Sequence, residues 1–129
     1  MEQVTINTSV NVKDGPLVKV NAQVESDAYV VASLALARTA TGDVTVLPAN
    51  GAAALLVIQA SKDADQAAAK VEVTPEGTAA GTKLVVVGSL LVANPDVVAG
   101  LAAGGPRKLT VKNTEAVDVT VSILTAFNS

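Results

Sequence analysis

The 129-residue chain contains no histidine, cysteine or tryptophan, and only one tyrosine, one phenylalanine and one methionine. The absence of cysteine excludes a disulfide framework, thiolate catalysis and cysteine-ligated zinc or iron–sulfur sites. The absence of histidine excludes imidazole general-base chemistry and histidine-ligated metals. Metals bound through oxygen, such as calcium, stay open on composition alone.

Charge is also scarce. Charged residues make up 16% of the chain, with a net charge of −3, against about 25% in ordinary soluble domains. Without a basic stripe, and with almost no aromatic side chain to stack on a base, we expect no nucleic-acid partner. The chain starts without the basic and apolar regions of a secretory signal, and its longest apolar run, residues 51–58, is too short to span a bilayer. We therefore expect a soluble protein made in the cytoplasm, with no membrane partner.

What the chain has instead is aliphatic. Half of its residues are apolar, and the mean hydropathy is +0.45. A small domain has much surface for its volume, so some of this alanine and valine must be exposed or covered by a partner. We expect an assembly subunit that is a homo-oligomer, for which a trimer is one option; the alternative is a monomer with an alanine-rich surface.

Most of the apolar residues alternate with polar ones, which is the period of strands with one buried face. Residues 4–12 and 17–25 flank a turn at Asp14-Gly15-Pro16 and predict an N-terminal hairpin within residues 1–25. Residues 28–38 are apolar on both parities, as a buried strand or a helix would be, and Val30-Val31 favours the strand. Residues 52–60 predict a central strand buried on both faces.

Later segments follow the same pattern. We predict a turn at 41–43 leading into a strand at 44–47, a loop or single helical turn at 61–69, a strand at 71–74, one strand over 83–92 bent at Gly88, and a closing hairpin of 109–111 and 117–123 around a turn at 113–116. Asn94 would cap, and Pro95 would begin, a short helix near 95–101. The fold class is therefore all-β: residues 1–129 form a single domain, an antiparallel β-sandwich or jelly-roll-like fold with that one helix.

Two stretches superficially resemble ligand loops. Residues 77–83 are glycine-rich and end in Lys83, but their spacing is not that of a phosphate loop, and a strand rather than a helix follows. Asp63 and Asp65 have the spacing of calcium ligands, but Lys62 opposes a cation and further oxygen ligands are missing. Both stretches are interpreted as loops.

The other candidates also have structural interpretations. Asp14, Asp27 and Asp43 sit at predicted turns, where aspartate is favoured for its side-chain hydrogen bonds. A serine nucleophile would need a lysine base, and no Ser-x-x-Lys pattern occurs. Tyr29 is expected in the core or at its rim, and Phe127 either plugs the sandwich or anchors the tail on a neighbour. We predict no catalytic, cofactor-binding or metal-binding residue, no cofactor and no enzymatic activity.

Several segments from Ala53 onward carry a family resemblance. They are the run 55–63, the strand 70–74, the pair Asn94-Pro95, and the stretches 107–114 and 117–124. In this layout an apolar strand ending in Ser-Lys-Asp precedes a Val/Thr strand, and a Val-x-Asn hairpin closes the domain. It resembles small structural proteins of tailed phages, of the head decoration or minor capsid type.

The resemblance implies a virion structural protein that stabilises a phage shell through many small interfaces and is located in the virion. It implies the major capsid protein or other virion subunits as partners, and no catalytic residue. The N-terminal strand, rich in Thr, Ser and Asn, could pair with the sheet edge of a neighbour or exchange with it. The alternatives are a tail, fibre or other surface-assembly subunit and, behind them, a carbohydrate-binding β-sandwich module.

Overall fold

The computed structural model describes residues 2–11, 13–47, 51–76, 83–102 and 106–128. Within these ranges the elements are β1 (Glu2–Asn11), β2 (Leu17–Ser26), β3 (Ala28–Leu36), β4 (Thr41–Thr45), β5 (Ala52–Lys62), β6 (Lys70–Pro75), β7 (Leu84–Val87), β8 (Ser89–Val92), α1 (Pro95–Ala99), β9 (Lys108–Asn113) and β10 (Val119–Asn128). The all-β fold with one short helix is confirmed.

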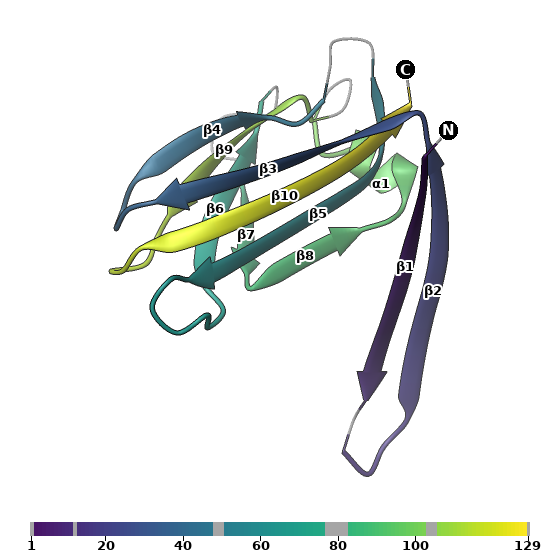
Figure 1. Cartoon of the computed structure of the whole chain (residues 1–129), viewed down its shortest axis with the longest axis horizontal. Helices are drawn as coiled ribbons and strands as arrows, with labels where there is room; N and C mark the ends of the chain where they lie inside the picture. Colours follow the sequence, from purple (N-terminus) through teal and green to yellow (C-terminus); the bar gives the residue numbers. More distant parts are fainter. Residues whose placement is uncertain (1, 12, 48–50, 77–82, 103–105, 129) are drawn as a thin grey trace.

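Two four-stranded sheets, with strand orders β3-β10-β5-β8 and β4-β9-β6-β7, enclose the main core (Figure 1). The alternation expected from the sequence places one parity of each strand between the sheets. Buried side chains from both sheets, such as Ile58, Ile123, Val71 and Leu109, form this core. In β5, residues 53–56 are all buried, so the prediction of a central strand covered on both faces is confirmed there.

The strand pairing is that of a jelly roll. β3 pairs with β10, β4 with β9, β5 with β8 and β6 with β7, each time antiparallel. The first half of the sandwich therefore runs alongside the second half in reverse order, and additional β5–β10 and β6–β9 pairs complete the sheets. This double winding of eight strands distinguishes a jelly roll from a simple meander.

The predicted closing hairpin is wrong. β9 and β10 are strands, but β9 pairs with β4 and β6, whereas β10 pairs with β3 and β5. The segment between them crosses from one sheet to the other. Alternation reveals which face of a strand is buried but carries no information about its neighbour, so two one-sided strands in opposite sheets have the same pattern as a hairpin.

The predicted turn at residues 41–43 is also wrong, because β4 begins at Thr41 and ends at Thr45. The turn lies just before it, where Thr39 has a φ of 62°. Gly42 is needed for close packing instead: a Cβ there would lie 3.0 Å from Leu36 Cδ2. The glycine signals an approach of side chains to the backbone and not a reversal of the chain.

The single bent strand predicted over 83–92 is two strands in different sheets, β7 and β8. Gly88 joins them with a φ of 78°, a conformation that glycine adopts without strain. Its N–H donates to Ala69 O at 2.9 Å, and its carbonyl accepts from Ala60 N at 2.6 Å. The bend is therefore a crossover that is itself hydrogen-bonded to β5 and to the residue just before β6.

The short helix begins as predicted and ends two residues earlier, at Ala99. Asn94 Oδ1 accepts hydrogen bonds from Asp96 N at 3.0 Å and Val97 N at 3.4 Å, which satisfies amide groups that the first turn leaves unpaired. Val98 anchors the helix in the main core. None of the helical structure in the described residues is long and apolar enough to cross a membrane.

The N-terminal strands β1 and β2 form a separate two-stranded antiparallel sheet. This hairpin projects from one end of the sandwich, and its turn lies far from the two larger sheets (Figure 1). At its base, Ile6 and Val24 pack with Leu55 and Ala126 in a second, smaller core. The junction is fixed by Asp27 N, which donates to Phe127 O and to Asn128 Oδ1, each at 3.0 Å.

Candidate functional site

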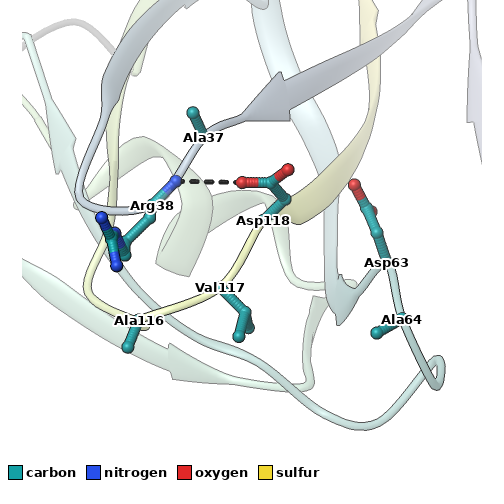
Figure 2. A pocket seen from close by; sticks show the side chains of 7 residues that line it. All are labelled: Ala37, Arg38, Asp63, Ala64, Ala116, Val117 and Asp118. Carbon is teal, nitrogen blue, oxygen red and sulfur yellow. Dashed lines mark hydrogen bonds between the residues drawn. The ribbon is translucent and has the colours of Figure 1, made fainter.

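An open depression of about 780 Å³ lies at the loop end of the sandwich, lined by Ala37, Arg38, Asp63, Ala64, Ala116, Val117 and Asp118 (Figure 2). Its charged residues come from the β3–β4, β5–β6 and β9–β10 connections, which meet because each of these connections passes between the sheets. The depression thus brings together Asp63, which the sequence singled out, with Arg38 and Asp118, which it did not.

Hydrogen bonds give both carboxylates a structural role. Asp118 Oδ1 accepts from Arg38 N at 3.2 Å, and Asp63 Oδ1 accepts from Thr120 Oγ1 at 2.6 Å. Asp63 N also donates to Asp118 O at 3.1 Å. Figure 2 shows the Arg38 guanidinium pointing away from both carboxylates. The two aspartates tie three connections together, and the rest of the lining is alanine and valine, which offers no nucleophile.

Asn113 fixes the same end of the molecule from inside. Its fully buried Nδ2 donates to Leu36 O at 3.2 Å, Ala37 O at 3.1 Å and Val117 O at 2.9 Å. Its Oδ1 accepts from Glu115 N at 2.8 Å. One side chain therefore satisfies backbone groups of the β3–β4 and β9–β10 connections. An asparagine in a simple hairpin turn would not link two such connections.

The remaining sequence candidates are dispersed. Asp65 Oδ1 accepts from Ala67 N at 3.0 Å within its own loop, and Lys62 lies 3.8 Å from Glu115. Lys83 pairs with Glu72 at 3.1 Å, whereas residues 77–82 of the glycine-rich stretch lie outside the described residues. In the described part of the chain, no group of three or more acidic side chains is placed to hold a metal ion.

The aspartates singled out at turns also differ in their settings. Asp14 lies in the β1–β2 turn, with a φ of 60°. Asp27 joins β2 to β3, and Asp43 lies within β4. The hydrogen bond from Thr110 Oγ1, at 2.8 Å, and the charge of Lys108 hold the pKa of Asp43 below its ordinary value of 3.8. Phe127 lies in the main core, and Tyr29 is exposed, so the two aromatics do not form a common surface.

The outer face of the β3-β10-β5-β8 sheet is the more distinctive surface. Its outward positions, by strand parity and register, are Tyr29, Val31, Ser33 and Ala35 on β3, Thr120, Ser122, Leu124 and Ala126 on β10, Leu55, Val57, Gln59 and Ser61 on β5, and Ser89 and Leu91 on β8. None of these side chains is charged. We call this surface the uncharged face.

An apolar row crosses the uncharged face from edge to edge. Val31, Leu124, Val57 and Leu91 are neighbours in register on the four strands of the sheet. Val31 is 66% exposed and Leu91 is 42% exposed. A hollow of about 180 Å³ lies over the centre of the row. Composition indicated that apolar side chains would be exposed, but their gathering into one row depends on the register of three strand pairs.

No protein-family model matches the chain, and no curated protein sequence matches it. Among solved structures, the chain is similar to one in the capsid asymmetric unit of cyanophage Pam1, with a TM-score of 0.43 and 17% sequence identity over 92% of this chain and 96% of that one. The assignment of a jelly roll rests on the strand pairing and not on this similarity.

Proposed function

We propose that the chain is a non-catalytic structural subunit of a tailed-phage virion, of the capsid decoration or minor head type. The observation that carries the proposal is the uncharged face with its exposed apolar row. Monomeric proteins normally keep charge on such a surface, and a contiguous apolar patch indicates contact with another protein. Jelly rolls include viral capsid and lectin domains as well as enzymes, so the fold by itself selects none of these functions.

The size of the face fits a subunit that acts in many copies. Strands lie about 4.8 Å apart and rise about 3.3 Å per residue, so the face spans roughly 20 by 23 Å, or about 450 Å² in projection. The hairpin base already covers the end of it at Leu55 and Ala126. A stable one-to-one interface takes about 800 Å² from each partner. One face thus supports a modest contact, and a regular shell that repeats the contact many times gains stability through multivalency.

The experiment is to purify phage particles from cells that carry the gene and to locate the protein in them. We expect it to sediment with intact particles in a density gradient and to be labelled on the head by a specific antibody in electron micrographs. Label on the tail would support the tail or fibre alternative. A protein that stays at the top of the gradient, apart from every particle fraction, would refute a virion role.

A carbohydrate-binding module is distinguished by its ligand surface. Sugars stack on aromatic side chains, and the uncharged face carries Tyr29 as its one aromatic residue. We therefore expect no binding on a glycan array. Binding that disappears on Tyr29→Ala would favour this module over the virion subunit.

A further inference from the structure

Strand β3 forms one edge of the β3-β10-β5-β8 sheet and differs from the other edges of the sandwich. It is nine residues long and contains no charged residue, proline or glycine. Edge strands of soluble proteins are normally short, or carry charges or proline that prevent pairing with a strand of another molecule. The other three edges follow this rule: β7 and β8 have four residues each, and β4 has five, including Asp43.

The outer side of β3 is an unpaired backbone edge. Its register is with β10 alone, and none of the described strands pairs with its other side. Figure 1 shows β3 as the border of the sheet opposite β8. Alternate residues of an edge strand direct their N–H and C=O groups away from the sheet. β3 therefore offers a row of backbone donors and acceptors to a further strand.

Side chains on both faces of β3 are also incompletely covered. On the core side, Val30 and Leu34 are only partly buried, whereas Val121 and Ile123 on the neighbouring β10 are 0% and 1% exposed. On the outer face, Val31 is 66% exposed. The edge thus leaves apolar surface in water that an added strand would help to cover, which favours its addition.

A strand that pairs with this edge has to match its length and its lack of charge, since a charged side chain directed between the sheets would be buried without a partner. Among the described strands of this chain, those with an open edge and more than five residues are β1, β2 and β3. The sequence of β1 includes Glu2, and that of β2 includes Lys19 and Glu25. The strand that fits the β3 edge best is therefore β3 of another copy.

We propose that two copies of this chain associate by antiparallel pairing of their β3 edges around a two-fold axis. Pairing over the whole strand is centred on Ala32 and places Val31 of each copy opposite Ser33 of the other. Opposing residues then have the same parity, so the uncharged faces of both copies lie on one side of a continuous eight-stranded sheet. Such an isologous contact closes both β3 edges at once and ends the assembly at a dimer.

The pairing also joins the two uncharged faces. The apolar rows of the two copies lie on the same side of the joined sheet, offset by two residues, and the area available to a further partner roughly doubles. This brings the area closer to the about 800 Å² that a stable interface takes from each partner. The inference rests on the proposed role as an assembly subunit, and it specifies a dimer as the unit that binds a shell.

The first test exploits the register with two double variants of the full chain. With Val31→Lys and Ser33→Lys, each lysine opposes a lysine of the other copy. With Val31→Lys and Ser33→Glu, each lysine opposes a glutamate. Like charges directly opposite destabilise a strand pair, and opposite charges stabilise it. Both positions are exposed and adjoin uncharged Leu124 and Ser122 on β10, so both variants should fold.

Light scattering after size exclusion should give twice the 12.9 kDa of one chain for the unchanged protein and for the Lys/Glu variant. We expect self-association of the Lys/Lys variant to be weaker by about tenfold. The matched control carries Val85→Lys and Val87→Lys on the edge strand β7, at positions 53% and 63% exposed, and should dimerise like the unchanged protein. A monomeric unchanged protein, or equal self-association of the Lys/Lys and Lys/Glu variants, would overturn the proposal.

The second test locates the contact. Because the chain has no cysteine, chains with the single substitution Ser33→Cys or Gln59→Cys can be treated with a short bismaleimide. In the proposed dimer the two Ser33 positions are diagonal neighbours, about 7–8 Å apart. The two β5 strands that carry Gln59 are separated by four strands, or about 24 Å. We expect cross-linked dimers with Ser33→Cys and none with Gln59→Cys. Links at both positions would show stacked faces, and these, like links at neither, would overturn the pairing of edges.

The virion role and the pairing of β3 edges can fail separately. If the pure protein is monomeric but sediments with phage particles, the inference is wrong and the proposed function stands. If the protein dimerises with the expected dependence on charge but is absent from particles, the inference stands and the proposed function is wrong.

Discussion

The two outer faces of the sandwich share a core but differ in charge. The face of the β4-β9-β6-β7 sheet carries Lys108, Asp43 and Lys112 among its outward residues, and Lys70 and Glu72 face outward on β6. Lys108 lies 3.5 Å from Asp43. The uncharged face has hydroxyl, amide and aliphatic groups at the corresponding positions.

This difference separates what folding requires from what contact requires. Folding needs apolar side chains between the sheets, and both sheets supply them. Solubility needs charge on at least one exposed face, and one sheet supplies it. The uncharged face is not required by either demand, and this is why the proposed role as an assembly subunit rests on it.

The two outer faces differ because the sheets pack back to back. Of the substitutions considered, Asn113→Ala is expected to weaken this packing most. The substitution leaves the carbonyls of Leu36, Ala37 and Val117 without their buried donor. We expect a loss of about 3 kcal/mol in the free energy of unfolding, measured by urea denaturation.

Asn113→Asp sharpens this result. It keeps the shape but places a carboxyl group beside three carbonyl oxygens, so it should be at least as destabilising near neutral pH and less so in acid, where the carboxyl group is protonated and can donate. A loss below about 0.5 kcal/mol for both variants, the range of ordinary surface substitutions, would mean that the crossover segments are held by other contacts.

A comparison of Leu55→Ala with Lys112→Ala measures how much an outward side chain on each face contributes to the free energy of unfolding. Leu55 points outward on the uncharged face but is fully buried under the hairpin base, so its truncation should cost about 3 kcal/mol. Lys112 is exposed on the charged face, and its truncation should cost less than about 0.5 kcal/mol. Hydrogen exchange should also become faster in β1 and β2 of Leu55→Ala. Equal costs would contradict the idea that the hairpin covers this part of the face.

The smallest effect concerns the charged face and pH. Because Thr110 and Lys108 lower the pKa of Asp43 in the folded state, the ionised carboxylate favours folding above the ordinary value of 3.8, and that contribution is lost as the pH falls from 3.8 through the lower folded value. We expect a slightly higher melting temperature for the unchanged protein than for Asp43→Asn at pH 6, and convergence of the two in strong acid. A difference that persists unchanged to the lowest pH would rule out titration of Asp43 as its source.

Much of the local structure was predictable. Within the described residues, the strands predicted at 4–12, 17–25 and 71–74 are found at Glu2–Asn11, Leu17–Ser26 and Lys70–Pro75. These strands, the buried run after Ala52 and the Asn94 cap follow from periodicity and capping chemistry, which act over a few residues. The wrong predictions at 41–43, 83–92 and 109–123 all concern which strands pair and which residues pack against each other. Gly42 avoids a clash with Leu36, Gly88 carries the chain between sheets, and Asn113 bridges both sheets; in each case the cause lies in residues that are distant in sequence or in the other sheet.

The sequence by itself determined that this is an all-β chain poor in reactive side chains, because composition and alternation are properties of each segment alone. Only the tertiary structure decided the pairing of β3 with β10 and β5 with β8, and therefore the alignment of Val31, Leu124, Val57 and Leu91. The reason is that register between strands far apart in the chain is set by the packing of the whole sandwich. The same packing leaves the hairpin extended beyond the sandwich (Figure 1).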